Sequence, residues 1–185
     1  MKRFFVVLLG FLLVSSQAQN NYYPTRVGMR WVYSSGEIKE YAREDTVFNT
    51  KVLVLQTTVK DQLAAEDYIV SNANGVIFLG NKVGQQTTQF KPPLILYPKS
   101  PLQVGMQWQT TSDVGGGYKI TASTQVIGTG GVKVKAGRFN AFIIRSTFYQ
   151  PDGTSTTTDV YFVPSIGTVK TVNDDGSSID LLSRK

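Results

Sequence analysis

The chain has 185 residues, with 19 Lys and Arg against 13 Asp and Glu, and it contains neither histidine nor cysteine. Those two absences exclude Ser-His-Asp and Cys-His catalysis, and they remove the usual zinc and copper ligands. The sequence therefore predicts no catalytic residue, no metal site and no cofactor, and we expect a protein that is not an enzyme.

The first predicted element is a secretory signal peptide over residues 1–18. Lys2 and Arg3 precede an apolar run of 11 residues, Phe4 to Val14, and Ser16-Gln17-Ala18 offers small residues where a signal peptidase reads. Spanning a bilayer takes about 20 apolar residues, so the run is too short for a membrane anchor. We expect cleavage after Ala18.

The mature chain, residues 19–185, is expected to be one exported domain, periplasmic or extracellular, that does not span a membrane. Signal removal leaves 17 basic and 13 acidic residues, and the resulting charge of +4 mainly favours solubility. Without cysteine the chain has no residue to carry a lipid anchor. A domain of this size buries about 70% of its unfolded surface, which is enough for a core without disulfides.

The first half of the mature chain shows alternating apolar and polar residues between turn signals, which predicts strands near residues 29–33, 51–59, 67–70 and 75–79. Residues 51–59 (KVLVLQTTV) begin apolar on both faces, as expected of a strand covered on both sides. The only helix candidates, 38–45 and 61–67, lack an apolar stripe, so we expect strand or turn there.

The second half continues the pattern, with strands predicted at 118–126, 132–137, 140–150, 155–163, 168–172 and 178–182. Val132 and Val134 alternate with Lys133 and Lys135, so the two pairs face opposite ways. The predicted fold is all-β: an antiparallel curved sheet of ten to twelve strands that closes into a flattened barrel or a sandwich.

A five-residue block, V-G-M-x-W, occurs twice, at Val27–Trp31 and Val104–Trp108, each time after a Tyr-Pro pair. Its recurrence suggests an internal duplication with halves 22–96 and 97–185. Glycine permits a bend into a strand, and the Met and Trp that follow share one face. We interpret the block mainly as a packing device. The alternative is a ligand-binding platform formed by Met29, Trp31, Met106 and Trp108.

Two sets of charged residues are further candidates. Five basic residues could form one face on neighbouring strands and attract lipid phosphates or acidic glycans, with nucleic acid not expected as a partner; scattered solvated charges are the alternative. These residues are Lys119, Lys133, Lys135, Arg138 and Arg145. A glycan hydrolase would need two carboxylates about 5–9.5 Å apart. The acidic candidates are Glu37, Glu40, Glu44, Asp45, Glu66 and Asp67.

Four motifs resemble those of a bacterial exported family of unknown function, the TapB-like proteins. They are Tyr23-Pro24 with Val27–Trp31, the second block at Val104–Trp108, the segment Val132–Phe142 (VKVKAGRFNAF) and the segment Tyr161–Lys170 (YFVPSIGTVK). The resemblance extends over nearly all of the mature chain. It implies a periplasmic or surface β domain, and it implies no established activity.

These observations favour a non-enzymatic exported module that binds an apolar or amphipathic ligand such as a lipid, because curved sheets and barrels commonly hold such ligands. A structural or interaction protein of the cell envelope, with another envelope protein as its partner, is the second hypothesis. A carboxylate-dependent glycan hydrolase is the third. An outer-membrane barrel is disfavoured because charges fall within the predicted strands.

Overall fold

The computed structural model describes residues 22–150 and 152–185, so the expected signal peptide lies outside the described residues. The regular elements of these residues are twelve strands. They are β1 (Arg30–Tyr33), β2 (Glu37–Val47), β3 (Thr50–Val59), β4 (Gln62–Asn72), β5 (Gly75–Val83), β6 (Gln86–Pro98), β7 (Gln107–Asp113), β8 (Lys119–Val134), β9 (Gly137–Tyr149), β10 (Ser155–Val163), β11 (Gly167–Asn173) and β12 (Ser178–Arg184). None of the described residues forms a helix long and apolar enough to cross a membrane.

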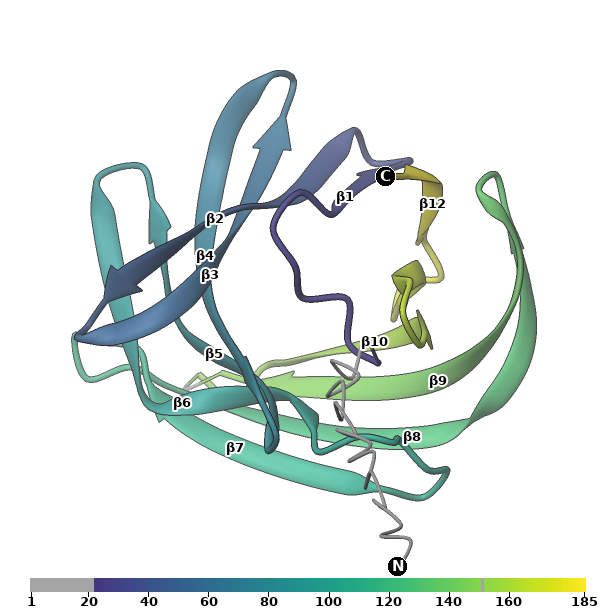
Figure 1. The fold of residues 1–185 in the computed structure, drawn as a ribbon. Coiled ribbons are helices and arrows are strands. Elements are labelled where there is room, and N and C mark those ends of the chain that lie inside the picture. The colour runs from purple at the N-terminus through teal and green to yellow at the C-terminus, as the bar shows by residue number, and fades with distance from the viewer. Residues whose placement is uncertain (1–21, 151) are drawn as a thin grey trace, which may run out of the picture.

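Each strand pairs antiparallel with the next along the chain, and β12 returns to pair with β1 (Figure 1). At that closure Trp31 lies opposite Arg184 and Val32 opposite Ser183. An even number of strands allows a ring to close with every pair antiparallel. The all-β prediction is confirmed, and the closed barrel is the form found among the two that the sequence suggested.

The two helix candidates of the sequence are strands, β2 and β4. The strand β3 is covered on both faces, as its sequence predicts. Leu53 and Leu55 pack against the main core, whereas Val52 and Val54 belong to a second buried cluster with Tyr68. Strand alternation places these two pairs on opposite sides of the sheet.

The strand β8 corrects a detail of the prediction. The strand expected at 118–126 and the first part of the one expected at 132–137 are a single strand of 16 residues, and the glycines between them do not interrupt it. Lys135 and Ala136 form the turn, and Gly137 already belongs to β9. The register with β9 shifts between Val126 and Gly128, which is the signature of a β-bulge. Glycine in a strand interior often marks such a bulge, so these residues bend β8 without ending it.

Aromatic side chains fill much of the barrel. Tyr22, Tyr23, Tyr97 and Phe162 make ring contacts with one another, with centroids 4.9–6.2 Å apart in five pairs. The segment 22–29, which precedes β1, runs across the inside of the ring (Figure 1). In a barrel of roughly eight strands, the side chains of the strands can fill the interior by themselves. A ring of twelve strands encloses more space than that. The segment and the aromatic residues occupy part of that extra space.

The contact between β6 and β7 is the sparsest pairing in the ring, with one backbone register pair, Lys91 and Asp113. Pro92 and Pro93 follow Lys91 and have no N–H to donate to a ladder. Side chains of β7 replace part of the missing pairing. Trp108 Nε1 donates to the Ile95 carbonyl at 3.1 Å, and the Ile95 N–H donates to Thr110 Oγ1 at 3.4 Å.

Candidate functional site

Both V-G-M-x-W blocks form the same turn. The N–H of Met29 donates to the Arg26 carbonyl at 3.2 Å, and the N–H of Met106 donates to the Gln103 carbonyl at 3.1 Å. Gly28 and Gly105 have φ of 87° and 92°. A turn closed by such a bond, with a positive φ at its third residue, is a type II turn, which selects glycine there.

Each turn also forms a hydrogen bond to the second strand after it, β2 in the first copy and β8 in the second. Gly28 N–H donates to the Tyr41 carbonyl and Gly105 N–H to the Val126 carbonyl, both at 2.8 Å. Tyr41 and Val126 each immediately precede a register shift in their strand, β2 or β8. The block is therefore a repeated structural unit of turn, strand and bulged partner. The proposed half boundaries, 22–96 and 97–185, remain a prediction.

The four residues of the predicted platform do not form one site. Trp31 is buried, and its Nε1 donates to the Ile166 carbonyl at 2.7 Å. Trp108 is half-buried at the contact between β6 and β7. The Met106 sulfur accepts a hydrogen bond from the Gln103 N–H at 3.1 Å, inside its own turn. Of the four, Met29 alone lines the main cleft described below.

The predicted basic face is brought together only in part. Lys133 lies opposite Arg138 near the end of the β8–β9 hairpin, and Lys135 follows in the turn, all three exposed. Lys119 begins β8, at the far end of that long strand. Arg145 forms a two-point ion pair with Asp159, with both N–O distances 2.8 Å. Three of the five residues therefore gather at the hairpin end.

The carboxylates of Glu66 and Asp67 lie on opposite faces of β4, as neighbours in a strand must. Glu66 is buried and accepts hydrogen bonds from Arg43 Nη1 at 2.8 Å and Gln56 Nε2 at 2.9 Å. The bond from Arg43 is the largest cause of its lowered pKa. Burial raises the pKa of Asp67, partly opposed by the positive charge of Lys39. Glu66, which Arg43 holds in its ionised form, is therefore suited to a structural ion pair rather than to proton donation.

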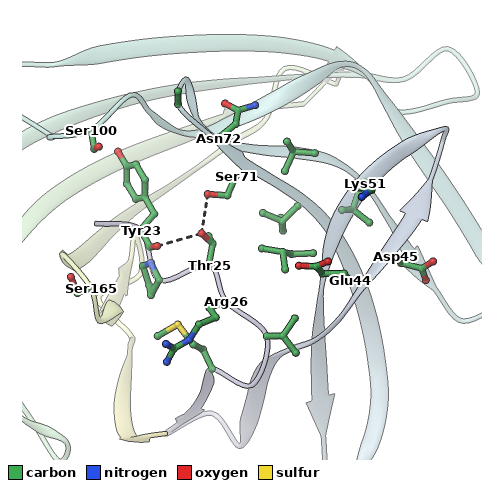
Figure 2. A pocket seen from close by; sticks show the side chains of 18 of the residues that line it. Tyr23, Thr25, Arg26, Glu44, Asp45, Lys51, Ser71, Asn72, Ser100 and Ser165 are labelled. Carbon is green, nitrogen blue, oxygen red and sulfur yellow. Dashed lines mark hydrogen bonds between the residues drawn. The ribbon is translucent and has the colours of Figure 1, made fainter. Parts of the chain in front are cut away.

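The main cleft has a volume of about 1140 Å³ and lies between the segment 22–29 and the wall formed by β2, β3 and β4 (Figure 2). Its apolar lining includes Met29, Leu53 and Ile69. Leu53 pairs with Ile69 across β3 and β4, and both pack into the main core. The cleft is therefore continuous with the apolar interior of the barrel.

One side of the cleft is held in place by hydrogen bonds of the segment 22–29. Thr25 Oγ1 bonds Ser71 Oγ of β4 at 2.9 Å, as Figure 2 shows. The Tyr23 hydroxyl donates to the Pro98 carbonyl at 2.7 Å. Burial raises the pKa of Tyr23, so its phenol stays protonated and remains a donor at neutral pH. The segment is thus fixed at both the cleft wall and the barrel interior.

Charged side chains surround this apolar lining. Four are basic, Arg26, Lys51, Lys99 and Arg184, and two are acidic, Glu44 and Asp45. Within the residues that the structure describes, none of the four cations lies within 4.0 Å of a carboxylate oxygen. Asp45, in contrast, is bound by Arg43 Nε at 3.2 Å. The cleft combines an apolar base with an excess of unpaired positive charge.

Local sequence patterns do not point to most of these cleft residues. The four basic residues come from the segment before β1, from β3, from the β6–β7 connection and from β12. Alternation predicts that Lys51 and Leu53 share a face of their strand, but it does not reveal what that face meets. Met29 was named from its motif, and only the fold places it beside Leu53 and Ile69.

Comparisons with known proteins give one similarity in fold. No protein-family model matches the chain, and no curated protein sequence matches it. A crystal structure described as that of a "putative lipoprotein" from Parabacteroides distasonis aligns with a TM-score of 0.43 and 12% sequence identity. The alignment covers 89% of this chain and 98% of that one. The description belongs to that protein, and a likeness at this level carries no argument about the function of this chain.

Proposed function

We propose that residues 19–185 are an exported, non-enzymatic module that binds an apolar or amphipathic ligand, such as a lipid, in the main cleft. The observation that carries the proposal is the cleft of about 1140 Å³ with Met29, Leu53 and Ile69 in its lining and charged groups around them. Ligand sites are typically concave, largely apolar and supplied with a few polar groups. Export is proposed from the signal-peptide pattern of residues 1–18.

The volume supports a ligand of lipid size. Pockets that bind small molecules usually measure about 300–1,000 Å³. At about 1140 Å³ the cleft slightly exceeds this range, and it is open to solvent. A chain could therefore lie on Leu53 and Ile69 while its polar end stays hydrated. An amphiphile suits this arrangement better than a fully polar molecule, because water leaves apolar surface on both partners.

Expression of the full chain with residues 1–18 in a bacterial host tests both parts of the proposal. The periplasmic fraction should contain a protein that begins at Gln19 by intact mass. The purified protein should enhance the fluorescence of N-phenyl-1-naphthylamine, and Leu53→Gln should weaken probe binding about ten-fold, since it removes buried apolar contact. Leu63→Gln is the matched control, because Leu63 is 55% exposed and outside the cleft.

Two results would count against the proposal. Absence of a saturable fluorescence change with the wild-type protein would contradict the proposal that the protein binds an apolar or amphipathic ligand. Equal loss of binding in Leu53→Gln and Leu63→Gln would remove the cleft as its site. A urea unfolding curve of each variant separates lost binding from lost folding.

A second candidate function is attachment to another envelope component through the basic end of the β8–β9 hairpin. The observation that favours it is the exposed group Lys133, Lys135 and Arg138, which has no carboxylate within 4.0 Å among the described residues. Chemical cross-linking in whole cells would test it. Cross-links that map to this hairpin and disappear in the triple glutamine variant would favour attachment over ligand binding.

A further inference from the structure

We infer that the ligand of the cleft is an amphiphile with an acidic headgroup, a carboxylate or a phosphate ester, on an apolar chain. This inference rests on the proposed function and narrows it to a class of ligand. The acidic and basic side chains of the cleft differ in whether they form ion pairs.

The two acidic side chains of the cleft, Glu44 and Asp45, do not both face its open space. Asp45 is bound by Arg43 and, by strand alternation, lies on the opposite face of β2 from Glu44. Glu44 pairs with Leu53 in the β2–β3 register and therefore shares the face that lines the cleft. Of the two carboxylates that line the cleft, Glu44 alone is consequently on the face of Leu53 and is not bound by Arg43.

The positive charges remain available. Arg26 lies on the segment side and Lys51 on the opposite wall in Figure 2. Lys51 pairs with Thr46 in the β2–β3 hairpin and shares its face with Leu53. Long basic side chains lay their methylene stems on apolar surface and keep the charged head in water. A bound chain on Leu53 would thus have cations from two sides at its polar end.

Charge complementarity decides between classes of amphiphile. An anionic headgroup gains attraction from these unpaired cations, an uncharged headgroup gains none, and a cationic headgroup is repelled. Guanidinium and ammonium groups form their strongest hydrogen bonds with carboxylate and phosphate oxygens. The same arrangement predicts that binding weakens with salt, because exposed charges are screened over about 10 Å at 0.1 M.

The test is displacement of N-phenyl-1-naphthylamine from the full mature chain by dodecanoate and by 1-dodecanol, which differ only at the head. At pH 7 and low salt, dodecanoate should compete at least about ten-fold more strongly, and 0.5 M NaCl should reduce the ratio. Arg26→Gln and Lys51→Gln should each lower the ratio about two- to five-fold, the size expected of an exposed ion pair. Glu44→Gln should raise it.

The control is Lys60→Gln, at an exposed lysine in the turn between β3 and β4 and outside the cleft, which should leave the ratio unchanged. Equal competition by the two amphiphiles, with no effect of the cleft variants, would overturn the acidic headgroup and leave the proposed function standing. Absence of displacement by both would overturn the two together. An equal fall of the ratio in Lys60→Gln would also overturn the acidic headgroup, because net charge and not the cleft would then set the preference.

Discussion

The rings of Tyr23 and Tyr97 stack inside the barrel, with centroids 5.2 Å apart and an interplanar angle of 17°. Each is the tyrosine of a Tyr-Pro pair that precedes a V-G-M-x-W block. The Tyr23 hydroxyl also donates to the carbonyl of Pro98, the proline after Tyr97. The two copies of the motif are therefore in direct contact through their first residues, and the turn geometry of the blocks agrees in both copies.

The two tryptophans should differ in their effect on stability. Trp31→Phe removes the donor to the Ile166 carbonyl and should lower the free energy of unfolding by about 1–3 kcal/mol, the cost of an unsatisfied buried group. Trp108→Phe, at a half-exposed position, should cost less than about 1 kcal/mol. Urea denaturation followed by circular dichroism measures both. Equal losses would contradict the burial difference.

A side chain at Gly167, the first residue of β11, should destabilise the protein. The φ of Gly167 is 98°, and an added Cβ would lie 3.2 Å from Pro24 Cγ and 3.4 Å from Trp31 Nε1. Gly36 also has a positive φ, of 85°, but open space around it. Gly36→Ala should cost about 1–2 kcal/mol from the backbone alone. In thermal denaturation Gly167→Ala should lower Tm further, and an equal or smaller decrease would contradict the close contact.

The ion pair of Arg43 and Glu66 should stabilise the protein in a pH-dependent way. The folded state lowers the pKa of Glu66, so the stabilisation is present above the unfolded pKa, near 4.5, and is lost as pH falls through the folded pKa. Arg43→Met should therefore cost about 1–3 kcal/mol at pH 7 and much less at pH 3. Arg145→Met, which breaks an exposed pair, should cost clearly less than Arg43→Met at pH 7.

The contribution of Asp67 to stability should have the opposite pH dependence. Burial raises its pKa in the folded state, so folding favours the protonated form. Its contribution to stability is greatest below the unfolded pKa, near 3.8, and declines as pH rises through the folded pKa. Asp67→Asn should consequently raise the urea midpoint at pH 7 relative to wild type, with the gain shrinking toward pH 3. A lower midpoint at pH 7 would show that the charged carboxylate is a stabilising group.

Local patterns were sufficient for the fold class and for most strands. Alternation located β9, β10 and β12, and the doubly apolar run of residues 51–59 correctly indicated a strand with both faces covered. The strand β6 is not among the predicted strands, and it contains Pro92 and Pro93, residues that are rare in a paired strand. The two prolines lie where β6 has few backbone hydrogen bonds with β7, since these strands share one register pair.

The cleft could not be predicted for a different reason. Arg26 and Arg184 are nearly the full length of the described chain apart, and they line one site because the ring closes between β1 and β12. No periodicity within a strand encodes that closure. The motif signal was local as well: it found the turns at Gly28 and Gly105 but could not tell that Met29 lines a cleft while Met106 bonds within its own turn.

Closure of the ring also sets the order in which the chain can assemble. Eleven of the twelve pairings join strands that follow each other in sequence, so they can form as hairpins with short loops. The twelfth joins Trp31 to Arg184, and its loop-closure entropy is the largest in the molecule. Until it forms, the nascent protein is an open sheet with β1 and β12 as bare edges. Crowded, newly made chains are then most exposed to edge-to-edge aggregation, and the closed ring removes that hazard.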